Sequence, residues 1–127
     1  MPGLPARRPH FLRNSADIER VKQCGRRLPT PLFNLMSFQA GSHQTRVGII
    51  VGRRFGGAVM RNRAKRIFRE LTRQMAGRLV TGYDLLVFPR RGALALEHIR
   101  LRDAWTAALR QEGLLMPQSD VQCNESA

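Results

Sequence analysis

The stretch R-R-F-G-G-A-V-M-R-N-R-A-K-R-I-F-R, residues 53–69, contains seven basic residues and no acidic residue. Its second part has the spacing of an amphipathic helix, which we expect to run over about residues 58–76. With about 100° between successive residues, six apolar side chains fall in one arc that is wide enough to face a core. These are Met60, Ala64, Ile67, Phe68, Leu71 and Met75. The basic side chains occupy the other side, so a helix that packs its apolar face presents a positive surface.

The segments around this helix have the composition of β-strands. Residues 46–52 form a β-branched run before the helix, and residues 83–88 form an apolar run after it. Strand, helix and strand in this order predict a parallel βαβ unit, which the general rule expects to be right-handed. Residues 32–39 alternate between two faces as a strand does, and we expect them to pair with residues 46–52 in an antiparallel hairpin.

Two further helices are expected near the ends of the chain. Ser15 is a plausible N-cap for a helix over about residues 15–24, which ends near Gly25. Apolar residues at helical spacing predict a last helix over about residues 95–112.

The length of 127 residues and the hydrophobic content of 43% suit one domain with one modest core. We expect this domain to cover residues 14–113. Residues 1–13 are rich in proline and arginine and predict a flexible basic arm. Residues 114–127 predict a flexible polar tail.

The charge of the chain favours an anionic macromolecule as partner. Lysine and arginine number 22 against nine acidic residues, which gives a net charge of +13. Such a charge repels itself unless a polyanion such as nucleic acid neutralises it. No apolar run is long enough to cross a membrane, and residues 1–8 lack the apolar core of a signal peptide, so we expect a cytoplasmic protein. The two cysteines lie far apart, and we expect free thiols.

Groups that could hold a catalytic metal ion are scattered along the sequence. Asp17 and Glu19 diverge on their predicted helix, and the three histidines have no metal-binding spacing. The glycines before the long helix match no nucleotide-binding motif. We therefore expect no dedicated metal site and no small-molecule substrate. The basic helix face is the better candidate, because a merely solvated helix mixes both signs of charge.

Residues 59–70, V-M-R-N-R-A-K-R-I-F-R-E, resemble the R-N-R signature helix of the bacterial ribonuclease P protein subunit. Residues 52–59 resemble the basic loop that precedes it in that family, and the similarity covers about residues 10–112. The resemblance implies an α+β fold, a single-domain α/β sandwich of the ribosomal protein S5 domain 2-like type. Its element order is α-β-β-β-α-β-α, with an additional strand near residues 26–28. It also implies a left-handed βαβ crossover, against the general rule.

In that family the RNA subunit is the catalyst, and it uses Mg²⁺ to remove the 5′ leader from precursor tRNA. The resemblance therefore implies two partners, ribonuclease P RNA and precursor tRNA, and a protein that is the non-catalytic subunit of an endoribonuclease. Mg²⁺ is then held mainly by the RNA subunit and the substrate.

The resemblance also implies two sets of site residues. The positions that match the contact region for the catalytic RNA, here named the basic surface, are Arg53, Arg54, Arg61, Asn62, Arg63, Lys65, Arg66 and Arg69. The positions expected to line the leader cleft are Ile18, Lys22, Asn34, Met36 and Phe38. In this family, aromatic residues are common at the positions of Ile18, Lys22 and Met36, so this chain departs from the family pattern there. Ala64 replaces a larger aliphatic residue, so the helix either packs more closely or buries less there.

Two other functions remain open at this point. A ribosomal or other structured-RNA-binding protein shares the basic charge and the small α/β fold. A protein-only nuclease would cut precursor tRNA without added RNA and would depend on its own carboxylates. The scarcity of clustered carboxylates disfavours the nuclease.

Overall fold

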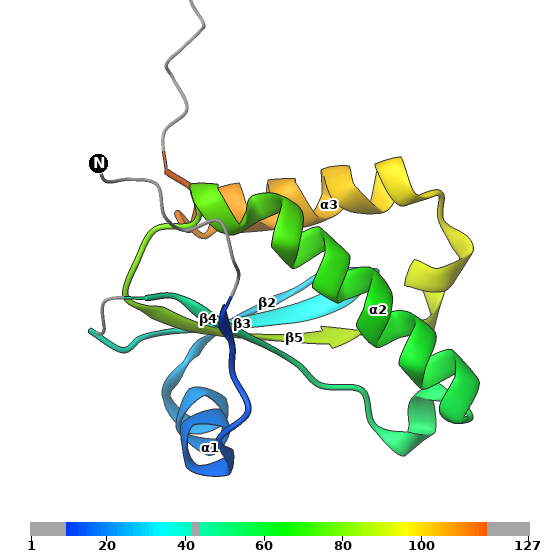
Figure 1. Cartoon of the computed structure of the whole chain (residues 1–127), viewed down its shortest axis with the longest axis horizontal. Coiled ribbons are helices and arrows are strands. Elements are labelled where there is room, and N and C mark those ends of the chain that lie inside the picture. The colour runs from blue at the N-terminus through cyan, green and yellow to red at the C-terminus, as the bar shows by residue number, and fades with distance from the viewer. Residues whose placement is uncertain (1–9, 42–43, 117–127) are drawn as a thin grey trace, which may run out of the picture.

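The computed structural model describes residues 10–41 and 44–116, which form one mixed sheet covered on both faces. Helices α2 and α3 cover one face and α1 covers the other (Figure 1). The strand order is β1-β4-β5-β3-β2. The strands are β1 His10–Phe11, β2 Arg26–Pro29, β3 Phe33–Gln39, β4 Arg46–Ile49 and β5 Tyr83–Pro89. The helices are α1 Ser15–Cys24, α2 Ala58–Met75 and α3 His98–Gln111, with short 3₁₀ helices η1 Arg53–Phe55, η2 Ala76–Arg78 and η3 Arg91–Ala95.

The predicted hairpin between residues 32–39 and 46–52 is wrong. Strand β3 pairs antiparallel with β5 and β2, while β4 pairs in parallel with β5 and β1. Strand β5 takes the centre of the sheet because it is apolar on both faces: Leu85, Leu86 and Val87 are all fully buried. Closeness in sequence favours a hairpin, but the burial of β5 outweighs it.

The parallel βαβ unit predicted from β4, α2 and β5 is confirmed, and its connection is left-handed (Figure 1). The general expectation of a right-handed crossover is therefore wrong for this chain, and the hand implied by the family resemblance is correct. A right-handed connection between the same two strands would place α2 on the face that α1 covers. The left-handed connection places α2 beside α3, where both helices share one core.

That main core lies between the sheet and the helices α2 and α3. Its centre is three aromatic rings, Phe33, Phe68 and Trp105, whose centroids lie 5.5–5.8 Å apart in edge-to-face arrangements. A smaller cluster under α1 contains Leu12, Val21, Met36 and Leu86. Strand β3 contributes side chains to both cores: Phe33 and Leu35 lie in the main core, and Met36 lies in the smaller one. This division follows the alternation that the sequence predicts.

The observed helices differ from the predictions at three ends. Helix α1 has the predicted bounds, but its N-cap is Asn14 and not Ser15, since the Asn14 side chain accepts hydrogen bonds from the backbone N–H of Ala16 and Asp17. Helix α2 ends at Met75, one residue before the predicted end, and the chain continues into η2. Helix α3 starts three residues later than predicted, because the chain before it forms η3. The additional strand implied near residues 26–28 is present as β2.

The domain extends further than predicted in both directions. His10 and Phe11, assigned to the arm of residues 1–13, form β1 beside β4, and Leu12 is buried. At the other end Leu114 is buried and Leu115 forms a β-bridge with Leu79. Residues 1–9 of the predicted arm and residues 117–127 of the predicted tail lie outside the described residues.

Candidate nucleic-acid interface

Helix α2 buries the predicted apolar side and presents the basic one. Ala64, Phe68, Leu71 and Met75 are buried, while Met60 and Ile67 are half-buried at the edges of that side. The pattern did not predict the burial of Thr72. Its hydroxyl donates a hydrogen bond of 2.8 Å to the Phe68 carbonyl oxygen, so this buried polar group is satisfied. Packing of this side fixes the rotation of the helix and therefore the direction in which its arginines point.

The basic surface forms one continuous part of the molecule, made by η1 and α2. Two of its members, Arg61 and Lys65, are half-buried, and the other six are exposed. Within residues 10–41 and 44–116, none of its seven cationic side chains forms an ion pair with a carboxylate. No carboxylate in the described part of the chain therefore neutralises these positive charges.

The turn before α2 holds Arg53 and Arg54 at the start of this surface. Phe55 is buried and anchors η1, so the two preceding arginines stay exposed. Gly56 follows with a φ of 152°, a backbone conformation that favours glycine. A Cβ at this position would also lie 3.2 Å from the Met60 sulfur. The glycine therefore lets the chain turn tightly into α2 next to Met60.

The residues predicted for the leader cleft come from α1 and β3. Ile18, Met36 and Phe38 come together around the smaller core. Met36 is only 7% exposed, so it contributes little surface to a ligand. Lys22 is exposed and lies 3.6 Å from a carboxylate oxygen of Glu19. Asn34 accepts a hydrogen bond of 3.3 Å from Arg90.

Sequence reasoning missed two half-buried apolar residues on the same side, Ile50 and Phe88, which pack against the smaller core. Phe88 is the direct partner of Asn34 in the β3–β5 ladder, so the two side chains share a face of the sheet. Alternation along β5 indicates that Phe88 and Leu86 face the same way. Only the pairing of β3 with β5 places that face beneath α1.

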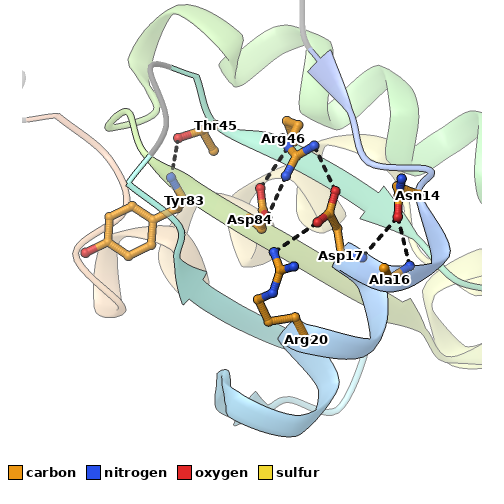
Figure 2. Close-up of polar contacts among 8 residues, drawn as sticks. All are labelled: Asn14, Ala16, Asp17, Arg20, Thr45, Arg46, Tyr83 and Asp84. Carbon is orange, nitrogen blue, oxygen red and sulfur yellow. Dashed lines mark hydrogen bonds and ion pairs between the residues drawn. The ribbon is translucent and has the colours of Figure 1, made fainter.

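Helix α1 is tied to the sheet by Arg46 (Figure 2). The Arg46 guanidinium donates two hydrogen bonds to the Asp84 carboxylate, at 3.0 and 2.8 Å, and a third of 3.2 Å to Asp17. Asp17 in turn accepts a hydrogen bond of 2.9 Å from Arg20. Asp84 is fully buried. One cation therefore joins β4, β5 and α1, and this link holds α1 against the sheet.

The same arrangement sets the charge state of Arg46. The hydrogen bonds and the negative charge of Asp84, with a smaller contribution from Asp17, raise the pKa of the Arg46 guanidinium above its ordinary value, although burial acts in the opposite direction. Arg46 therefore remains charged in any physiological solution. Asp84 and Asp17 accept hydrogen bonds from arginines, and through Arg46 these bonds hold α1 against the sheet.

A metal ion requires several ligand groups close together. The described residues contain no group of three or more histidine, cysteine, aspartate and glutamate side chains close enough to hold one. Among these same residues, no helix is both long and apolar enough to span a membrane.

Comparison with known proteins identifies the family. The family model described as Ribonuclease P matches residues 6–112. The chain belongs to the ribonuclease P protein family. Among its relatives is the ribonuclease P protein component of Chloroflexus aurantiacus, 41% identical over 111 residues, with 86% of this chain and 82% of the relative covered. The protein component of Thermotoga maritima is 36% identical over 95 residues, with 75% and 80% covered.

Solved structures of this family have the same fold. The RNase P protein of Thermotoga maritima superposes with a TM-score of 0.73 at 28% identity, covering 80% of this chain and 96% of its own. The RNase P protein of Staphylococcus aureus gives a TM-score of 0.74 at 21% identity, covering 84% and 98%. The resemblance seen in the R-N-R helix is therefore confirmed, and with it the α+β fold.

Proposed function

We propose that this chain is the protein subunit of a ribonuclease P ribonucleoprotein that removes the 5′ leader of precursor tRNA in the cytoplasm. In this proposal the RNA subunit is the catalyst, and the protein binds both that RNA and the leader. The observation that carries the proposal is the basic surface of η1 and α2, whose cationic side chains have no carboxylate partner within the described residues. Phosphate groups of RNA supply the missing counter-charge.

The leader is proposed to bind on the α1 side of the sheet. Ile18, Phe38, Ile50 and Phe88 are half-buried there and offer apolar surface to unstacked bases. Stacking of a base on an aromatic ring contributes about 1–3 kcal/mol. Because α1 and α2 lie on opposite faces of the sheet (Figure 1), the protein can hold the leader and the catalytic RNA at the same time. The cleft residues predicted from sequence, Lys22 and Asn34 included, stay a prediction.

Mg²⁺ is proposed to be bound by the RNA subunit and the substrate. The protein assists by neutralising phosphates, which lowers the concentration of Mg²⁺ that the folded complex requires. The absence of a three-residue metal cluster among the described residues is compatible with this division of tasks.

A cleavage assay at low magnesium concentration tests the proposal. Precursor tRNA is incubated with cognate ribonuclease P RNA, with and without the protein. We expect the protein to stimulate removal of the leader, and to cut nothing when the RNA subunit is left out. No stimulation would contradict the proposal, and cleavage by the protein alone would favour a protein-only nuclease. RNA recovered with the protein from cells separates a ribosomal role from this one.

A further inference from the structure

The second half of α2 and the start of α3 form a hollow that extends the basic surface. It has a volume of about 500 Å³, within the usual range of small-molecule pockets. Its lining residues are Arg66, Ile67, Arg69, Glu70, Arg73 and His98. Two of them, Arg66 and Arg69, belong to the basic surface. The other four are not among the positions that match the contact region for the catalytic RNA.

The charges in the hollow are unequal. Glu70 accepts a hydrogen bond of 2.7 Å from Arg73 and one of 3.4 Å from Gln74. Arg66 and Arg69 form no ion pair within the described residues. The Glu70 charge is therefore compensated by Arg73, and the part of the hollow near Arg66 and Arg69 keeps an excess of positive charge. This part attracts a phosphate group.

The hollow is too large and too mixed in character for a phosphate alone. The exposed part of Ile67, which is half-buried against the main core, adds an apolar surface that suits the edge of a base or a ribose ring. The Glu70 carboxylate repels phosphate but accepts hydrogen bonds from a base amino group or a ribose 2′-hydroxyl. His98, the first residue of α3, adds a further polar group. Together these groups match the three parts of a nucleotide.

We propose that this hollow binds one unpaired nucleotide of the catalytic RNA. Its phosphate lies against Arg66 and Arg69, and its sugar or base lies against Ile67 and donates a hydrogen bond to Glu70. The occupant is assigned to the catalytic RNA because the hollow is continuous with the basic surface on α2. The inference thus rests on the proposed function and adds a contact at the α3 end of α2.

The substitution Glu70→Met, which removes both acceptor oxygens of the side chain, separates this proposal from simple charge attraction. It removes one negative charge and releases Arg73, so charge attraction alone predicts tighter binding to catalytic RNA. If Glu70 accepts a hydrogen bond from the nucleotide, we expect binding that is several-fold weaker. The measurement is the dissociation constant for catalytic RNA at fixed salt concentration, with circular dichroism to confirm folding. Tighter or unchanged binding overturns the proposal.

Crosslinking gives a second, independent readout. A photoreactive group is attached to His98→Cys in full-length protein in which Cys24 and Cys123 are replaced by serine. We expect a crosslink from position 98 to an unpaired nucleotide of the catalytic RNA. The control is the same photoreactive group on Arg110→Cys, in the last turn of α3, which should form no such crosslink. Bound RNA without a crosslink at position 98, or with one only to paired nucleotides, overturns this inference alone. Failure of the unlabelled protein to bind catalytic RNA would instead overturn the proposed function.

Discussion

Arg46 links α1 to the sheet through polar contacts. It provides the carboxylate of the fully buried Asp84 with two hydrogen bonds and reaches Asp17 on α1 with a third (Figure 2). Its raised pKa means that this contribution to stability is present below the ordinary pKa of arginine and is lost only when the pH rises through the raised value. That window is strongly alkaline, so deprotonation of Arg46 does not affect stability near neutral pH.

Replacement of Arg46 by methionine should destabilise the protein strongly. The change leaves the Asp84 carboxylate buried without its cation, which costs about 3–5 kcal/mol when one partner of a buried pair is removed. Urea unfolding at neutral pH measures the free energy of unfolding. The control is Arg20→Met, which removes a more exposed partner of Asp17 and should cost no more than about 1 kcal/mol. Equal stabilities of the two variants would show that the Asp84 pair is not important.

Ala64 marks a close approach of α2 to the sheet. The family resemblance left two outcomes for this small residue, closer packing or less burial. Ala64 has no exposed surface, which favours closer packing. We expect Ala64→Leu to destabilise the protein by about 1–3 kcal/mol, because the added methyl groups overfill the site. Urea unfolding measures the effect, and a gain in stability would reveal an unfilled space beneath the helix.

At the scale of elements, Gly25 sets how closely α1 approaches β3. A Cβ at this position would lie 2.5 Å from the Val21 carbonyl oxygen and 2.9 Å from that of Ser37, so the backbone would have to shift. We expect Gly25→Ala to move the end of α1 and to weaken binding of the leader. The measurement compares the affinity of the reconstituted complex for precursor tRNA with and without its leader.

Two controls make this prediction specific. Binding to the catalytic RNA should not change in Gly25→Ala, because α2 lies on the other face of the sheet. Gly77→Ala should affect neither activity, since a Cβ there meets nothing within 4 Å. If Gly25→Ala weakens both kinds of binding equally, the effect is a general loss of folding.

Helix α2 should be responsible for the salt dependence of binding to the catalytic RNA. We expect Arg61→Ala combined with Arg63→Ala to weaken this binding and to flatten its dependence on salt. Each lost phosphate contact reduces the slope by roughly 0.7–0.9, because fewer counterions are released. Titrations at several salt concentrations measure the slope. The matched control is Arg100→Ala with Arg110→Ala on α3, and an unchanged slope in the α2 variant would contradict the assignment.

In the molecule as a whole, the left-handed crossover places the two proposed RNA-binding surfaces on opposite faces of the sheet. It places α2 beside α3 on one face of the sheet and leaves the other face to α1 (Figure 1). The basic surface and the leader side are therefore back to back across β4, β5 and β3. The sheet is the rigid spacer that would fix the distance between the two bound RNA segments.

Features with local sequence signals were predictable from the amino-acid sequence. The 3.6-residue period fixes the buried side of α2, and the R-N-R motif identifies the family. The alternation of β3 correctly divides Phe33 and Leu35 from Met36. These features depend on residues a few positions apart, so a single stretch of sequence contains all the information.

Features that join distant residues became visible only in the folded molecule. The central place of β5, the pairing of Phe88 with Asn34, and the link from Arg46 to Asp84 across 38 positions depend on which strands pair. The hollow between α2 and α3 depends on the hand of the crossover. Long-range pairing is set by the burial of the whole core, and no local pattern records it.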